Sequence, residues 1–292
     1  MSRGGGRATQ VRRWILAAVV LGTLALTPGG AMAQGEPTVT LVRVIDTSRW
    51  SPPSPDPTGI TYLPRTGRLL VSDSEVEDTG AFQGFNAFRM TRHGVVRRVF
   101  DFTWFTEEPA GIAAKPGNRK VLFLSDDDRD RIFILRAGPD RRFGTTDDRV
   151  EEIRTRRFGS RDPEGVSFGR RSLFVADGAD ARVFPIGRGP NKRFDGVPPH
   201  GDDQILAVID TALFGLRDPE DVDFDRETGH LFIVSRRDRV IAEVTLDGDV
   251  VYLYDISGSG ILHPSGVAAV RNPGDPSILR IYVSDRGIDN RR

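Results

Sequence analysis

The stretch that decides the fold is Asp162-Pro163-Glu164-Gly165-Val166, one of five copies of a short phrase in this 292-residue chain. Each copy has an acidic residue or His, then Pro, a variable residue, Gly or Asp, and a β-branched residue. The other copies are Asp56-Pro57-Thr58-Gly59-Ile60, Glu108-Pro109-Ala110-Gly111-Ile112, Asp218-Pro219-Glu220-Asp221-Val222 and His263-Pro264-Ser265-Gly266-Val267. Repeats spaced by about 45 to 56 residues are typical of propeller blades, and such a period is better evidence of fold than any local motif.

A second repeated stretch, apolar and closed by a small and a charged residue, follows each copy. The five stretches are Leu69–Asp73, Leu122–Asp126, Leu173–Asp177, Leu231–Arg236 and Arg280–Asp285. Each predicts a buried strand that ends in a turn. A third strand such as Arg131–Leu135 and a fourth such as Gln204–Asp210 follow before the next copy. We therefore predict an all-β chain, a β-propeller of five four-stranded blades, with six blades as the alternative.

The segment from Thr38 to Trp50 precedes the first repeat and predicts how the ring closes. Its end, Val44-Ile45-Asp46-Thr47, matches Val208-Ile209-Asp210-Thr211, which precedes the fourth copy. The N-terminal strand should therefore take the fourth-strand place of the last blade, which removes an exposed sheet edge. No third strand is evident for that blade, so it either has three strands or belongs to a longer protein.

Residues 1–33 have the three parts of a secretory signal peptide. A positive region, a short apolar run and a small-x-small site follow one another, as Arg3, Arg7, Arg12 and Arg13, then Trp14–Leu26, then Ala31-Met32-Ala33. Cleavage is expected before Gln34, leaving residues 34–292 as a single propeller domain; an uncleaved anchor is the alternative. The protein is expected to be secreted or periplasmic, in either case extracytoplasmic.

Composition limits the partners of the cleaved chain. It would keep 37 basic and 41 acidic residues, a balance too mild to indicate binding to nucleic acid or to a membrane surface. The absence of cysteine excludes disulfides, thiol catalysis and a thiolate metal site. After cleavage no apolar stretch is long enough to span a membrane. We expect a monomer that binds a small molecule or an extracellular or cell-envelope ligand.

Polar residues of both repeats should gather at one mouth of the central channel, because the loop before the first strand and the loop after the second open on the same face of a propeller. They are Glu108, Asp162, Glu164, Asp218, Glu220 and His263 before the first strands, and Asp73, Asp126, Asp127, Asp177, Arg236 and Asp285 after the second. A ring of carboxylates suits a divalent metal, and calcium accepts six to eight oxygen ligands. The predicted metal ligands are Glu164, Glu220, Asp126 and Asp177, and the predicted substrate-binding residues are His263, Arg236, Asp73 and Asp285. No catalytic residue is assigned.

Many of these acids also have a structural interpretation. An Asp before Pro often caps backbone N–H groups, and the Asp after each second strand can do the same in every blade. Glu164 and Glu220 differ, because the matching positions elsewhere are Thr58, Ala110 and Ser265. Two further acidic stretches, Gly138–Asp148 and Gly189–Asp203, space oxygen donors as calcium loops do but lack the EF-hand glutamate. They predict long hairpins with Asx turns.

The Pro-x-Gly-Val phrase, followed by an apolar strand and Ser/Ala-Asp, resembles NHL-type repeats. The layout is also similar to secreted propellers of the senescence-marker/gluconolactonase type and of the esterase-like phytase type. The gluconolactonase-like resemblance implies a divalent metal held over the channel by Glu, Asn and Asp. Glu164 and Asp177 match its acids by blade position, while no Asn stands at a matching loop. The function implied is metal-dependent hydrolysis of an ester, lactone or phosphoester, with a non-catalytic extracellular binding scaffold as the alternative.

Overall fold

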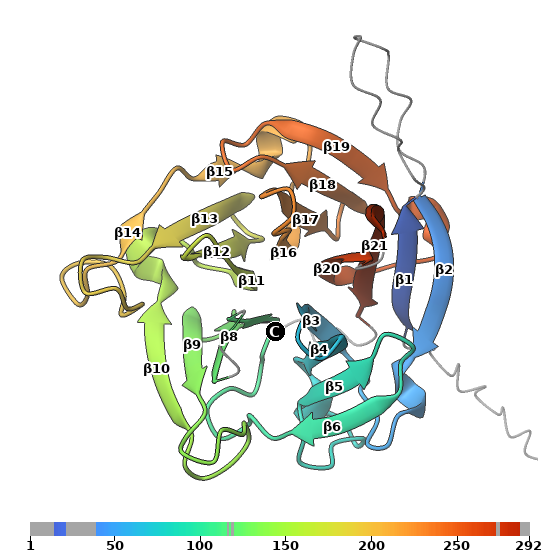
Figure 1. Cartoon of the computed structure of the whole chain (residues 1–292), viewed down its shortest axis with the longest axis horizontal. Coiled ribbons are helices and arrows are strands. Elements are labelled where there is room, and N and C mark those ends of the chain that lie inside the picture. The colour runs from blue at the N-terminus through green and yellow to red at the C-terminus, as the bar shows by residue number, and fades with distance from the viewer. Residues whose placement is uncertain (1–14, 22–38, 116, 118–119, 273–274, 287–292) are drawn as a thin grey trace, which may run out of the picture.

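The computed structural model describes residues 15–21, 39–115, 117, 120–272 and 275–286. Within this part of the chain the strands pair into five antiparallel sheets, which stand around a central axis (Figure 1). The chain is therefore an all-β propeller, as the repeats predicted. The described residues form no sixth sheet, so the alternative of six blades has no support. The helices found there are all short 3-10 turns, none long and apolar enough to cross a membrane.

Four sheets are each built from consecutive strands, and the strand nearest the axis comes first. The first sheet contains β3 (Pro57–Leu63), β4 (Arg68–Asp73), β5 (Ala87–Thr91) and β6 (Val96–Phe100). The second contains β7 (Gly111–Ala114), β8 (Val121–Asp126), β9 (Arg131–Arg136) and β10 (Arg149–Arg154). The third contains β11 (Pro163–Gly169), β12 (Ser172–Asp177), β13 (Arg182–Gly187) and an outer strand in two pieces, β14 (Gln204–Ile205) and β15 (Ile209–Asp210). The fourth contains β16 (Pro219–Phe224), β17 (Leu231–Ser235), β18 (Val240–Val244) and β19 (Val250–Asp255).

The 3-10 turns of the described chain are η1 (Thr47–Arg49), η2 (Val76–Asp78), η3 (Thr155–Phe158), η4 (Thr211–Phe214) and η5 (Ser257–Ser259). Four of them precede a first strand, and η2 follows the second strand of the first sheet. In η1 and η4 the preceding Asp46 and Asp210 accept a hydrogen bond from the backbone N–H two residues on. This shared cap is why the sequences around Asp46 and Asp210 match.

The fifth sheet, called the closing sheet below, joins both ends of the chain. Its order is β2 (Val39–Asp46), β1 (Ile15–Leu21), β21 (Asp275–Asp285) and β20 (Pro264–Asn272). β2 is the outermost strand, in the fourth-strand place that the sequence predicted, but it pairs with β1 and not directly with the strands near residues 266–284. The expected lack of a third strand is wrong for this structure. β1 fills that place, pairing with β2 on one side and β21 on the other. An unpaired strand edge favours any segment that can supply hydrogen bonds, and the apolar run 15–21 supplies them.

Five buried hydrophobic clusters fill the spaces between neighbouring sheets, one at each junction. The cluster around Phe123 and Phe184, for example, joins the β7–β10 and β11–β15 sheets. The cluster that joins the closing sheet to the β3–β6 sheet contains Ile45, Ile60 and Tyr282. Because each core needs two sheets, the ring is stable only when it is closed.

The innermost strands approach one another so closely that the repeated glycine has no room for a side chain. A Cβ on Gly59 would lie 2.6 Å from the Cα of Gly111, and a Cβ on Gly111 would lie 2.8 Å from the Cα of Gly165. A Cβ on Gly165 would lie 2.3 Å from the Cα of Asp221. The fourth copy departs from glycine because the Asp221 carboxylate accepts a hydrogen bond from the Val267 N–H of the closing sheet, at 2.8 Å.

Other polar side chains bridge the remaining junctions near the axis. The Thr58 hydroxyl donates to the Pro109 carbonyl at 3.2 Å, and the Ser125 hydroxyl donates to the Glu164 carbonyl. The Ser167 hydroxyl accepts from the Phe224 N–H at 3.0 Å, and the Ser265 hydroxyl donates to the Pro57 carbonyl at 3.0 Å. The bonds to Pro57, Pro109 and Glu164 lie where first strands begin and fix the loops before them, which carry residues of the channel mouth.

We predict that Gly111→Ala lowers the free energy of unfolding by about 2–4 kcal/mol, because the added methyl group overlaps backbone atoms of the next sheet. The control is Gly80→Ala, where a Cβ meets nothing within 4 Å. Urea unfolding followed by circular dichroism measures both. Equal stability of the two variants would contradict the close approach.

We further predict that Ile45→Ala costs about 2–4 kcal/mol, because Ile45 is buried in the core that joins the closing sheet to the β3–β6 sheet. Val44→Ala is the matched control, since Val44 is the next residue of β2 and is 47% exposed. Its cost should stay within about 0.5 kcal/mol. Thermal and urea unfolding test this, and a harmless Ile45→Ala would mean that β2 does not pack on the ring.

Candidate functional site

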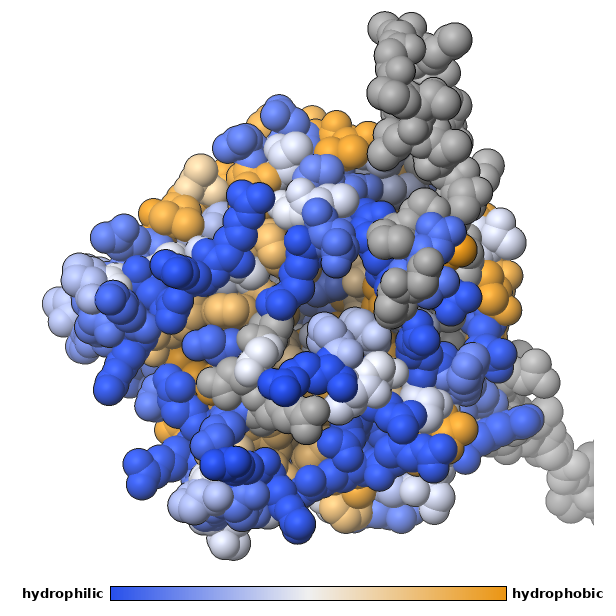
Figure 2. Space-filling model, viewed as in Figure 1, coloured by the Kyte–Doolittle hydropathy of each residue, from blue (hydrophilic) through white to orange (hydrophobic). Residues whose placement is uncertain are grey.

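A cavity of about 630 Å³ opens at the channel end where the innermost strands begin. Its walls are formed by Glu75, Glu108, Asp127, Asp128, Asp162, Glu164, Arg236, Arg237, Leu262, His263 and Arg286. Figure 2 shows one face of the whole ring, on which hydrophilic residues in blue predominate and hydrophobic residues in orange form scattered patches.

Five carboxylates of this mouth form what we call the acidic cluster: Glu108, Asp127, Asp128, Asp162 and Glu164. Ligand oxygens of Glu108, Asp127 and Asp128 lie within 4.8 Å of one another. The same holds for Asp127, Asp162 and Glu164, so Asp127 belongs to both groups. The cluster spans two sheets, because Glu108 and Asp127 flank β7 and β8, and Glu164 lies on β11.

The acidic cluster is electrostatically strained. Burial raises the pKa of Glu108 to about 8, and the nearby charges of Asp127 and Asp128 add to the effect. Burial likewise raises the pKa of Asp127 to about 6, although Arg286 lowers it. The pKa of Glu164 is raised well above its ordinary value by burial and then by the neighbouring Glu220. These three carboxylates are therefore better accommodated with a proton or a cation beside them than as bare anions.

The opposite wall of the mouth is ion-paired. The Arg236 guanidinium lies 3.0 Å from an oxygen of Glu220 and 3.3 Å from one of Asp218. Arg286 lies 3.4 Å from Asp56 and 3.7 Å from Glu220. Burial still raises the pKa of Glu220 to about 8, against the opposing effect of both arginines. Glu220 is thus held by two cations, whereas no such ion pair is found for the acidic cluster in the described residues.

Four of the predicted site residues serve the loops instead of the cavity. Asp73 accepts from the Asp56 N–H at 2.9 Å, and Asp177 accepts from the Arg161 N–H at 2.8 Å. Asp285 accepts from the His263 N–H at 2.6 Å. Asp126 accepts from the Thr106 hydroxyl at 2.7 Å and from the Arg129 N–H at 2.8 Å. These are the turn-capping roles of the structural interpretation, and none of the four lines the mouth.

The fourth sheet explains why Arg236 reaches the mouth. Its second strand ends in Ser235-Arg236, where three other sheets have Ser-Asp and one has Ala-Asp. Asp238 takes over the capping, because it accepts from the Arg217 N–H at 2.8 Å and from the Ser235 hydroxyl at 2.8 Å. The residue after the strand, Arg236, therefore does not have to cap this loop, and it pairs with Glu220.

Of the predicted site residues, Glu164, His263 and Arg236 line the mouth, and Glu220 contacts it through the two arginines. The sequence did not lead us to choose Asp127 or Asp128 as metal ligands, or Arg286 as a residue of the site. The run Asp126-Asp127-Asp128 carried a signal, since the matching residues of the next repeat are Asp177-Gly178-Ala179. Two acids beyond the capping Asp occur in this repeat alone.

The two long hairpins contain the expected Asx turns. The Arg142 N–H donates to the side chain of Asp140 at 2.8 Å, and the Arg193 N–H donates to the side chain of Asn191 at 2.7 Å. In the second hairpin the carboxylates of Asp195, Asp202 and Asp203 also lie within 4.8 Å of one another. Each of the three carboxylates accepts a backbone N–H group through one of its oxygens, as Asp203 does from Gly196 at 2.7 Å.

Comparison with known proteins supports the fold and no particular family. No protein-family model matches the chain, and no curated protein matches its sequence. The structure is similar to that of a nidogen/laminin complex, with a TM-score of 0.50, 16% identity, and coverage of 92% of this chain and 85% of the other. A protein of unknown function from Bacteroides thetaiotaomicron gives a TM-score of 0.50 at 12% identity, covering 96% of this chain and 71% of the other. At these identities the likeness shows the propeller fold alone. A glutaminyl cyclase from Myxococcus xanthus is also similar, with a TM-score of 0.49, 12% identity, and coverage of 81% and 93%.

We predict that the metal-free protein becomes more stable as the pH falls from 8 to 6. The folded-state pKa of Glu108 (about 8) and of Asp127 (about 6) exceeds the ordinary value of an unfolded carboxyl. The folded state then binds more protons, and this stabilisation is complete below about pH 4 and lost as the pH rises through 6 and 8. Melting temperatures in a chelator at pH 6, 7 and 8 test the sign.

The matched variants are Glu108→Gln, which should flatten this dependence, and Asp247→Asn, which should not, because Asp247 is exposed in the β18–β19 hairpin. A melting temperature of the metal-free protein that rises from pH 6 to pH 8 would contradict the strained cluster.

Proposed function

We propose that the channel mouth binds a divalent cation, calcium, through the acidic cluster, and that the protein is a metal-dependent hydrolase of a small ester, lactone or phosphoester. The observation that carries the proposal is the shared position of Asp127, whose carboxylate belongs to two groups of three within 4.8 Å. Such a concentration of negative charge is costly unless a cation offsets it.

The donor set fits a hard cation. Every member of the acidic cluster offers carboxylate oxygens. Calcium and magnesium favour oxygen ligands, whereas zinc and copper are commonly bound by nitrogen and sulfur ligands. The five side chains come from two sheets and supply enough oxygens for calcium, which takes six to eight ligands, several of which can be bidentate carboxylates or water. We infer Asp127, Asp162 and Glu164 as the principal ligands, with Glu108 and Asp128 beside them.

The residues around the cluster suit the binding of a polar substrate. A bound divalent cation supplies Lewis-acid polarisation of a carbonyl or phosphoryl oxygen. Arg236 directs its guanidinium toward the same cavity and can donate hydrogen bonds to a carboxylate or phosphate group. Glu108, whose pKa is raised to about 8 by burial, can hold or release a proton near neutral pH and is our candidate for proton transfer.

The wider context of the site is part of the proposal. We infer that residues 1–33 are removed as a signal peptide, that the mature protein is extracytoplasmic, and that each of the five sheets acts as one blade. The lactonase-like and phytase-like families remain resemblances of layout. Cleavage would remove β1 from the closing sheet, so we expect β2 to hold its place in the mature ring through the packing of Ile45.

A binding scaffold is the second candidate function. It is favoured by apolar side chains exposed just before two of the first strands: Leu262 beside the mouth is 63% exposed, and Leu213 in η4 is 85% exposed. Each leucine can add apolar contact area if a partner protein covers this part of the ring. In this case the acidic cluster and its cation would order the loops that the partner recognises.

We predict that calorimetric titration of the chelator-treated protein detects calcium binding and that Asp127→Asn weakens it at least about tenfold, because both groups of carboxylates lose their shared member. Asp247→Asn, the exposed control, should bind calcium as the parent does. Absence of heat and of a thermal shift at millimolar calcium would refute the metal site.

We also predict that a panel of esters, lactones and phosphoesters includes one that the protein hydrolyses with calcium and not with chelator, and that Glu164→Gln with Glu220→Gln abolishes this activity. Retention of the activity in the Asp247→Asn variant controls for folding. If calcium binds and no member of the panel is turned over, the hydrolase is rejected in favour of the scaffold.

A further inference from the structure

A second cavity lies between the β3–β6 and β7–β10 sheets, away from the acidic mouth. Its volume is about 220 Å³. The turn after β3 and the segment after β7 form one part of its wall, so it is placed toward the opposite end of the innermost strands. The loop between β9 and β10 covers it through Arg141, Arg142 and Phe143.

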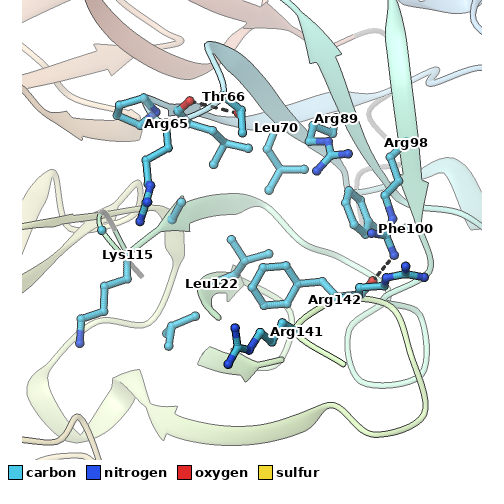
Figure 3. Close-up of a pocket in the computed structure, with 16 residues that line it drawn as sticks. Arg65, Thr66, Leu70, Arg89, Arg98, Phe100, Lys115, Leu122, Arg141 and Arg142 are labelled. Carbon is cyan, nitrogen blue, oxygen red and sulfur yellow. Dashed lines mark hydrogen bonds between the residues drawn. The ribbon is translucent and has the colours of Figure 1, made fainter. Parts of the chain in front are cut away.

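This cavity combines an apolar floor with a cationic rim. Figure 3 shows Leu70, Leu122 and Phe100 in its interior, surrounded by basic side chains from several strands and loops. The basic residues are Arg65, Arg89, Arg98, Lys115, Arg141 and Arg142. Among the described residues no carboxylate lines the cavity, and the ion pairs found there include none of Arg65, Lys115, Arg141 or Arg142.

Lys115 also faces the neighbouring junction, where its ammonium group lies 5.7 Å from the centre of the Phe168 ring. Burial lowers the pKa of this amine, and Arg188 and Arg136 of the neighbouring junction lower it further. The described lining of this cavity includes six basic residues and no acidic one, in a protein whose acidic and basic residues are equal in number. An anion entering the hollow would relieve their mutual repulsion.

The local backbone holds the covering loop in place. The Arg98 guanidinium donates to the Phe143 carbonyl at 2.9 Å and lies 4.9 Å from the centre of the Phe100 ring. Arg141 has φ 60°, a left-handed conformation that normally favours Gly or Asn, and its N–H donates to the Gly138 carbonyl at 3.0 Å. An arginine at this position brings a charge to the cavity at some conformational cost.

We propose that this cavity, called the cationic pocket below, binds a small organic anion that carries an apolar group of about one aromatic ring. Guanidinium groups bind phosphate and carboxylate oxygens with paired hydrogen bonds, which suits Arg65, Arg141 and Arg142 at the rim. The space equals about seven water volumes, enough for a ring and too small for a lipid with long chains. The site is independent of the acidic cluster and of the proposed hydrolysis.

The test uses phenyl phosphate as the probe, with inorganic phosphate and benzyl alcohol as its charge-only and ring-only counterparts. Titrations are run in chelator, so that a cation at the mouth cannot bind the phosphate. We expect phenyl phosphate to bind more tightly than either counterpart, to weaken as ionic strength rises, and to shift the methyl resonances of Leu70 and Leu122.

The variant is Arg65→Gln with Arg141→Gly, which removes two rim charges and relieves the left-handed backbone at position 141. The matched control is Lys192→Gly, because Lys192 occupies the same place in the sister hairpin with φ 62° and does not line the cationic pocket. We expect at least about a tenfold loss of affinity in the double variant and parent affinity in the control.

Three results would overturn the proposal. The first is no binding of phenyl phosphate at 10 mM, well above the affinity that paired charges and a buried ring should give. The second is equal affinity for benzyl alcohol, which would make the charges irrelevant. The third is binding that the double variant retains, or that shifts resonances of the mouth and leaves the Leu70 and Leu122 methyl groups unchanged.

Discussion

The close approach of the innermost strands governs the rest of the structure. Where glycine meets glycine across a junction, as at Gly59 and Gly111, the strands lie too near for any side chain. This proximity brings the loops before the first strands around a narrow opening, and hydrogen bonds such as that from Thr58 to the Pro109 carbonyl hold them there. The crowded mouth is a consequence of ring packing, and its chemistry depends on which residues the packing leaves free.

One position of the repeated phrase shows the difference between residues that hold the ring together and residues that are available for binding. The residue between Pro and Gly is a small or hydroxyl-bearing side chain in three copies, and in two of these, at Thr58 and Ser265, it joins neighbouring sheets. In the other two copies it is Glu164 or Glu220, and the bridging is done by other residues, including Ser125 and Asp221. The fold therefore tolerates both glutamates without needing them, which is the pattern expected of residues kept for binding. Glu220 is matched with arginines, whereas Glu164 joins carboxylates.

The sequence predicted the propeller, the repeated strands and the closure by β2, because period and apolar pattern follow directly from strands packed around an axis. It also predicted that Glu164, His263 and Arg236 lie at one mouth of the channel. It did not distinguish the capping aspartates from those that face the cavity: Asp126 and Asp127 are adjacent in sequence, yet only Asp127 faces the cavity. Side-chain direction at a turn depends on which backbone N–H groups need acceptors, and a repeat pattern does not contain that information. The β1 strand escaped prediction for another reason, since its apolar run also satisfies the rules for a signal peptide.

The central claim is that the acidic cluster is a calcium site. A crystal structure of residues 34–292 grown with calcium, with anomalous differences collected at a wavelength where calcium scatters anomalously, tests it most directly. We predict a peak whose ligands include carboxylate oxygens of Asp127, Asp162 and Glu164 at about 2.3–2.6 Å. A mouth without such a peak, or one in which Arg286 or Arg236 has moved to neutralise these three carboxylates, would contradict the account.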